Sequence, residues 1–475
     1  MSFLRTWRAT CPEGFRLNDQ DLSAFYSPAG ASGEKIGASM GKRELTAVLE
    51  FADHRLANGL RVLVGESSSL PIVSYQVHFA AGSRYEKPGI TGITHLFEHM
   101  MFKGTEKVGP EEFSRVIQAN GGTLNAFTTT DNTSYYENLP ADKFELAVQL
   151  EADRLENLRL TQETLEPERE VVRSERKLRS VNSPFGLLVE QLFALAYEQH
   201  SYRWPVIGWD QDLKNLTLED CREYYRVHYA PNNAVVVVVG DIEAEKVFRT
   251  VEKYYGPIPP QPPPRLAVTP ERPQRGEKRA VFKKVSQVGA FFAAFHIPGI
   301  THPDLFPLQV LCHALSLGRS SRFFEKLEKP GKAVEAQADM GHPPFFFMDP
   351  GILQIYAIAS PTTALETLEG EVWEAIETLR QEPLADEELF KAKKQTRSLF
   401  LQSLQTLFFQ GLLAGMYQIR AGDFHLIKTI LPNYESITAE DVLRVARKYL
   451  RPENRTVVLL QPVSQAEHED LGEIE

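Results

Sequence analysis

The sequence predicts an α+β fold used twice, in two similar domains that each pack helices against a mostly antiparallel sheet. Three observations predict it. The 475 residues exceed the usual size of one hydrophobic core, the chain contains an internal repeat, and each half has strands at its two ends with helical segments between them. The expected divisions are an extension over 1–48, a first domain over 49–256, a proline-rich linker over 257–277, a second domain over 278–465 and a tail over 466–475.

The repeat joins LTLEDCREYYRVHYAPNNAVVVVVG (216–240) to ITAEDVLRVARKYLRPENRTVVLLQ (437–461), which align without gaps. In both copies a threonine, Thr217 or Thr438, is the expected N-cap of a helix with acidic residues in its first turn. A Pro-x-Asn turn and a β-branched strand follow in both. Agreement of cap, turn and strand in register indicates a duplication.

Each half begins with strands. In HRLANGLRVLVGES (54–67), Asn58–Gly59 lies between alternating apolar residues and predicts a hairpin, and PIVSYQVHFAAGS (71–83) continues as a strand. In the second half, QVGAFFAAFHIPGI (287–300) has the same character. Between the halves, YYGPIPPQPPPRLAVTPERPQRGEKR (254–279) is too rich in proline for a helix or a central strand and reads as a semi-rigid linker.

Composition excludes several function classes. The formal net charge of −11 argues against a nucleic-acid-binding protein, which needs a clustered basic face. Three scattered cysteines, Cys11, Cys221 and Cys312, form neither a disulfide framework nor a CxxC metal site. The sequence has no apolar run of about 18 residues and no signal-peptide core, so we expect no membrane role and a cytoplasmic location, although so few cysteines also suit the periplasm. We predict no function for the extension over 1–48.

A metal-binding pattern lies in GITGITHLFEHMMFKGT (89–105), whose apolar residues have helical spacing. His95 and His99 are four residues apart, so on a helix they share one face and can bind one Zn²⁺ together. Glu98 is placed to act on a water at the metal as a general base without being a ligand. The alternative is a helix with two ordinary histidines.

A third ligand is expected because catalytic zinc usually has three protein ligands and one open position. The segment LEPEREVVRSERKLR (165–179) supplies candidates, since helical spacing predicts a buried stripe: Leu165, Glu168, Val171 or Val172, Glu175 and Leu178. Burying two unpaired carboxylates costs several kcal/mol, which a cation would offset. The alternatives are an ion pair of Glu175 with Arg179 and, for Glu168, a carboxylate that only favours the helix N-terminus.

These segments, with GSRYE (82–86), GGTLNAFTTTDNTSYY (121–136), SYRWPVIGW (201–209) and HYAPNNAVVVVVGD (228–241), resemble the inverzincin peptidases of the pitrilysin and mitochondrial-processing-peptidase type. The resemblance spans roughly residues 49–465 and implies two similar α+β domains. It implies that His95, His99 and Glu175 bind one Zn²⁺ per chain, that Glu98 is the general base and that Glu168 is a supporting carboxylate. It also implies that Asn125, Ala126 and Phe127 bind peptide through a strand edge; the alternative is a plain Thr-rich hairpin.

The second half has no metal pattern, because PDLFPLQVLCHALSLG (303–318) carries His313 alone. Family enzymes also need an arginine and a tyrosine, about seven residues apart, to hold the substrate carbonyl. The corresponding segment, RFFEKLEKPGKAVEA (322–336), has Glu328 and Val334 at those positions. The resemblance therefore implies a zinc endopeptidase subunit that cleaves unfolded peptides in a closable chamber, with a non-identical partner subunit supplying the Arg/Tyr pair. The alternatives are a homodimer active alone and a non-catalytic scaffold subunit.

Overall fold

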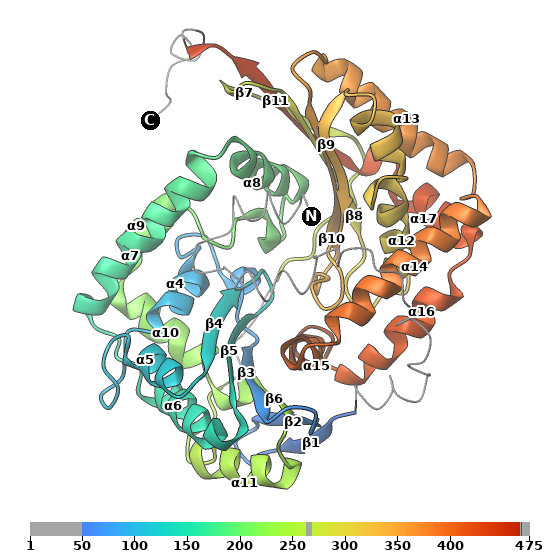
Figure 1. The fold of residues 1–475 in the computed structure, drawn as a ribbon. Helices are drawn as coiled ribbons and strands as arrows, with labels where there is room; N and C mark the ends of the chain where they lie inside the picture. Colours follow the sequence, from blue (N-terminus) through green and yellow to red (C-terminus); the bar gives the residue numbers. More distant parts are fainter. Residues whose placement is uncertain (1–49, 263–267, 466, 468–475) are drawn as a thin grey trace.

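The computed structural model describes residues 50–262, 268–465 and 467. Two halves, each with its own central sheet, lie side by side (Figure 1). The predicted extension and nearly all of the predicted tail lie outside the described residues. Within them the α+β class and the double use of one fold are confirmed.

The first half is built on a sheet that has six strands among the described residues, in the order β1-β2-β6-β3-β5-β4. The strands are β1 (Ala52–Arg55), β2 (Arg61–Glu66), β3 (Ile72–Phe79), β4 (Thr123–Thr128), β5 (Thr133–Pro140) and β6 (Ala234–Gly240). The helices are α4 (Ile93–Met100), α5 (Glu112–Ala119), α6 (Phe144–Asn157), α7 (Gln162–Arg176), α8 (Pro184–Ala196), α9 (Asp210–Asn215), α10 (Leu218–His228) and α11 (Ala244–Tyr255).

The second half is built on a sheet that has five strands in the same part of the structure, in the order β7-β11-β8-β10-β9. The strands are β7 (Lys278–Val285), β8 (Ala290–Ile297), β9 (Ala333–Asp339), β10 (Gly351–Ala359) and β11 (Arg455–Val463). The helices are α12 (Leu305–Ser316), α13 (Leu365–Gln381), α14 (Asp386–Ser403), α15 (Leu407–Ala421), α16 (Ile430–Ser436) and α17 (Ala439–Tyr449).

The two sheets have the same topology once β1 is set aside. Strands β2, β6, β3, β5 and β4 correspond in order to β7, β11, β8, β10 and β9. Each sheet contains one parallel pair, β2 with β6 or β7 with β11, and its other pairs are antiparallel. The predicted hairpin at Asn58–Gly59 is present, because β1 and β2 pair with Arg55 opposite Arg61 and Gly59 has a φ of +92°.

The repeat seen in the sequence is visible in atomic detail. The Thr217 hydroxyl accepts the N–H of Asp220 at 3.1 Å, and the Thr438 hydroxyl accepts that of Asp441 at 3.2 Å. After each helix an asparagine side chain donates to a carbonyl of the last turn. Asn233 reaches the carbonyl of His228 at 2.7 Å, and Asn454 reaches that of Tyr449 at 2.8 Å. Cap, turn and strand thus follow the predicted register in both copies.

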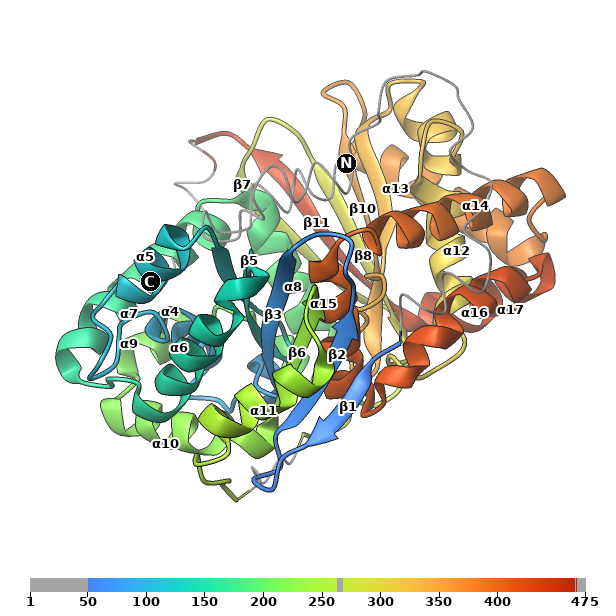
Figure 2. The same cartoon turned by 60° about the horizontal axis from the view of Figure 1, so that its bottom comes forward.

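The two halves exchange a helix. Helix α8 belongs to the first half but packs on the second sheet, where Leu188 and Leu192 join a buried cluster with Phe292 and Val458. Helix α15 belongs to the second half but packs on β2, β3 and β6 of the first sheet (Figure 2). Each sheet is therefore covered on one face by a helix from the other half, which explains why the strand Ala234–Gly240 is buried along its whole length.

Polar side chains bind the halves together beside α8. Asp349, on the segment before β10, accepts hydrogen bonds from Arg84 at 2.6 Å and from His200 at 3.0 Å, both in the first half. Burial raises the pKa of Asp349, but the bonds from His200 and Arg84 outweigh it and bring the pKa to about 2, below its ordinary 3.8. Asp349 therefore stabilises the fold above about pH 4, and this contribution disappears as the pH falls toward 2.

We expect Asp349→Asn to lower the free energy of unfolding by about 1 kcal/mol near neutrality, because Arg84 and His200 lose an ionised acceptor at a half-exposed site. The difference in the free energy of unfolding between the variant and the wild type should shrink between about pH 4 and about pH 2, where the wild-type carboxylate itself becomes protonated. Urea unfolding of both proteins at about pH 6 and about pH 3 measures it. A difference that is equal at both pH values would contradict the assignment.

No single helix of the described chain has the length and apolarity required to cross a membrane. One pair, α14 with α15, meets the requirement of length and composition only when both helices are counted together across a bend of 105°.

Candidate metal centre

Helix α4 is held by its N-terminus against two loops. The Glu86 carboxylate, from GSRYE, accepts the N–H groups of Gly92 and Thr94, each at 2.9 Å. Gly92 and Gly208 both have positive φ and lie backbone against backbone, so that a Cβ on Gly208 would collide with Gly92. These contacts give the SYRWPVIGW segment (201–209) a structural role, because its loop at Gly208 supports α4, the helix that carries both histidines.

The predicted helix with a buried apolar face is confirmed. Ile93, Leu96, Phe97 and Met100 are fully buried in the core of the first half. His95 is also buried, whereas Glu98 and His99 are half-buried. Burial, with His99 and Arg179 nearby, lowers the pKa of His95 well below its ordinary value. The ring is therefore neutral, as a metal ligand must be.

The three predicted ligands come together. The ligand atoms of His95, His99 and Glu175 all lie within 4.8 Å of one another. His95 Nε2 is 3.9 Å from Glu175 Oε1, and His99 Nε2 is 3.5 Å from Glu175 Oε2. Ligands of a tetrahedral zinc lie roughly 3.3–3.5 Å apart, as follows from bonds of about 2.0–2.1 Å. The 3.5 Å separation matches this value and the 3.9 Å separation is somewhat longer. Two imidazoles and one carboxylate are a donor set suited to Zn²⁺ that leaves a fourth position for solvent or substrate.

The alternative interpretation paired Glu175 with Arg179. The guanidinium of Arg179 does contact Glu175 Oε1. The contact is compatible with a metal, since Glu175 Oε2 faces His99 and a carboxylate offers several acceptor positions. The ion pair with Arg179 and a metal site at Glu175 are therefore compatible with each other.

The predicted buried stripe on α7 is partly wrong. Leu165, Glu168 and Val172 are buried as expected, with Val172 rather than Val171 on the stripe, but Leu178 is 69% exposed. The α-helix ends at Arg176 and continues as a π-helical turn over Lys177–Val181. A wider turn rotates the following side chains off the stripe, so α-helical spacing fails at Leu178 although it correctly brings Glu175 inward.

Glu168, the predicted supporting carboxylate, contacts the predicted ligand His99. Its Oε1 lies 2.8 Å from His99 Nδ1, which leaves Nε2 of that ring facing Glu175. Its Oε2 lies 2.7 Å from Lys103 Nζ. Burial raises the pKa of Glu168, but the bonds from His99 and Lys103 outweigh it, so the pKa lies below its ordinary value. A carboxylate bound to the outer nitrogen orients a metal-binding histidine. Sequence reasoning missed Lys103, although it lies one helical turn after His99.

Glu98 lies on the same helix as both histidines. Burial raises its pKa, against the lowering effect of His99 and of hydrogen bonds from Thr128. Its Oε2 is buried and accepts no hydrogen bond from the described residues. That oxygen remains available to take a proton, which a general base requires.

Asn125, Ala126 and Phe127 lie on β4, which is the edge of the first sheet and pairs only with β5 among the described strands. Thr128, the last residue of β4, is among the groups that lower the pKa of Glu98. The strand belongs to a β4–β5 hairpin, as the alternative has it, and the binding of peptide at its unpaired edge stays a prediction.

The described residues of the second half contain no group of ligands like that of the first half. His313 on α12 hydrogen-bonds the Thr396 hydroxyl at 2.6 Å, the arrangement expected of a histidine satisfied in the core. Glu328 accepts the N–H of Ala336 at 3.0 Å, and Val334 is 62% exposed on the edge strand β9. The carboxylate and the valine that we aligned with the Arg/Tyr pair have no donor to offer a substrate carbonyl.

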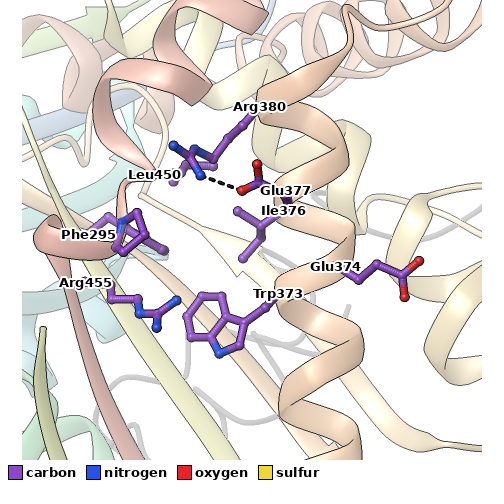
Figure 3. A pocket seen from close by; sticks show the side chains of 9 residues that line it. Phe295, Trp373, Glu374, Ile376, Glu377, Arg380, Leu450 and Arg455 are labelled. Carbon is purple, nitrogen blue, oxygen red and sulfur yellow. Dashed lines mark hydrogen bonds and ion pairs between the residues drawn. The ribbon is translucent and has the colours of Figure 1, made fainter.

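A cavity of about 370 Å³ lies in the second half, between α13 and the start of β11. Trp373 and Arg455 lie next to each other in it, and Arg380 pairs with Glu377 at its rim (Figure 3). Its lining contains no histidine or cysteine. It is separate from the metal cluster, all of whose ligands come from the first half.

Two descriptions of one protein family match the sequence. "Insulinase (Peptidase family M16)" matches residues 61–208, and "Peptidase M16 inactive domain" matches residues 215–396, so that together they span more than half of the chain. The chain belongs to peptidase family M16. In this M16 chain the whole metal cluster lies in the segment that matches the insulinase description.

Relatives of the M16 chain carry zinc-protease names. The zinc protease PqqE of Helicobacter pylori is 29% identical over 432 residues, which cover 90% of this chain and 96% of that protein. The uncharacterized zinc protease YmxG of Bacillus subtilis is 26% identical, over 85% of this chain and 97% of that protein. The crystal structure of a protease from Helicobacter pylori matches with a TM-score of 0.83 at 28% identity, over 87% of this chain and 99% of that chain. The match of the fold and the names of the related sequences therefore indicate the same family of zinc proteases.

Proposed function

We propose that this chain is the zinc-binding subunit of an endopeptidase that cleaves unfolded peptides. The observation that carries the proposal is the convergence of His95, His99 and Glu175 beside the free oxygen of Glu98. One zinc ion per chain would be held by these three ligands. A zinc ion bound there supplies a Lewis acid and makes a water molecule nucleophilic near neutral pH.

The protein's own groups perform the remaining work. Glu98 takes a proton from the attacking water and passes it to the leaving amine. Glu168 fixes the ring of His99 through Nδ1, with Lys103 holding its second oxygen. The open edge of β4 suits an extended peptide that adds as a further strand. A folded protein rarely offers such a strand, so unfolded segments are the expected substrates.

We further propose that the active site is divided between this chain and a non-identical subunit. The support is Glu328, whose carboxylate already accepts a backbone N–H, and Val334, which has no polar group. A partner with an arginine and a tyrosine would stabilise the oxyanion in a chamber that closes around the peptide. A homodimer active alone is the second candidate, and a non-catalytic scaffold is the third; the intact ligand set favours a catalytic chain.

Metal removal tests the proposal. The purified chain should contain about one zinc per chain by elemental analysis. Chelation should abolish cleavage of a fluorogenic peptide by the assembled complex, and stoichiometric zinc should restore it. The chain alone should show little turnover and gain it when the partner is added. Protein that contains no zinc would defeat the peptidase proposal, and full activity of the chain alone would defeat only the divided site.

A further inference from the structure

The residue that supplies the third ligand lies at a junction between the two halves. Glu175 is the last residue but one of α7, and the chain then passes through the π-helical turn into α8. Helix α8 lies on the second sheet, with Leu188 and Leu192 fully buried against it. The segment after Glu175 is thus fixed by a half of the molecule that has no metal ligand.

A buried ion pair joins the two helices across this turn. Arg176, the neighbour of Glu175, donates to both oxygens of Glu190 on α8, each at 2.9 Å. Both side chains are nearly buried, at 7% and 8% exposure. Two parallel bonds between planar groups fix orientation as well as distance. Glu190 is two residues from both Leu188 and Leu192, so α8 presents one face to the second sheet and another to α7.

A second contact reinforces the same turn. Gly186, in the first turn of α8, lies so close to the backbone carbonyl of Arg179 that a Cβ there would collide with it. Arg179 is the residue whose guanidinium contacts Glu175. The residue before the turn and the residue in the middle of the turn thus both contact α8, Arg176 through a side-chain pair and Arg179 through its backbone.

We infer that the Arg176–Glu190 pair is a positioning device for Glu175, through which α8 and the second half fix the third zinc ligand. The inference rests on the proposed zinc site. Arg176 contacts neither the substrate nor the atoms that would bind the metal. Its pair with Glu190 fixes the orientation of the C-terminal end of α7 relative to α8. The domain without a metal site then contributes to metal affinity, although none of its own residues is a ligand.

The test is the zinc affinity of the metal-free, full-length chain, measured by competition with a chromophoric chelator. In Arg176→Met/Glu190→Met both charges are removed together, which avoids an uncompensated buried charge and favours a folded protein. We expect zinc to bind about 10–100-fold more weakly, the usual cost of losing a residue that orients a ligand. The matched control is Glu223→Met/Arg226→Met, an exposed pair on α10 whose loss should leave the affinity unchanged.

Gly186→Ala provides an independent second variant, because it pushes α8 away from the turn without touching a charge. Circular dichroism must first show wild-type helix content. A folded variant of either kind that binds zinc as tightly as the wild type would overturn the inference alone. A wild-type chain without zinc affinity would overturn the proposed function as well, so the two failures are distinguishable.

Discussion

Glu98→Gln should reduce peptide cleavage by about 10²–10⁴-fold while zinc content stays at the wild-type level. The amide has the size of the carboxylate but cannot accept the proton of the attacking water, and general base catalysis contributes a factor of this order. Zinc should remain because Glu98 is not among the three clustered ligands. The measurement is the turnover of a fluorogenic peptide by the assembled complex, with metal content determined on the same preparation.

The matched control is Glu106→Gln, which makes the same chemical change at an exposed residue shortly after α4. It should cleave the peptide at the wild-type rate. If Glu98→Gln cleaved the peptide at the wild-type rate, the assignment of Glu98 as the general base would be wrong. A variant that lost zinc together with activity would instead assign Glu98 a structural part in the metal centre.

The metal centre could be predicted largely from the sequence because its geometry is local. His95, Glu98 and His99 share one helix, so their spacing alone fixes their relative positions. Glu175 was reached by adding helical periodicity to a family resemblance, and the structure brings it to 3.5 Å from His99. Periodicity then failed at Leu178, because the change from α- to π-helical geometry at Lys177 leaves no trace in an apolar/polar pattern.

The helix exchange could not be predicted, because it depends on which sheet an apolar helix covers. Helix α8 is apolar almost all round, and its sequence does not say whether Leu188 and Leu192 meet the first sheet or the second. A run of valines is typical of a strand with both faces buried, as Ala234–Gly240 is in the structure. It could not identify α15, from the other half, as the cover. Only the tertiary structure shows that the duplicated domains are interlocked.

Arg420→Met should lower the free energy of unfolding by about 1–3 kcal/mol, because the arginine is buried, joins the halves and satisfies buried acceptors. It lies near the end of α15 and is 4% exposed. Its guanidinium donates to Asn132 Oδ1 at 2.8 Å and to Thr129 Oγ1 at 2.9 Å in the first half, and to the carbonyl of Phe346 at 2.7 Å in the second. Methionine fills similar space but leaves these buried acceptors without their donor.

Urea unfolding followed by circular dichroism measures the loss, and Arg249→Met, at an exposed position of α11, should change it by less than about 0.5 kcal/mol. The shape of the transition is as informative as its midpoint. Because α8 covers one face of the second sheet and α15 covers one face of the first, each sheet loses the cover of that face once the other half unfolds. The variant should therefore still unfold in a single transition at lower urea. Two separated transitions would mean that the halves are independent, and the second half could then not hold Glu175 in place.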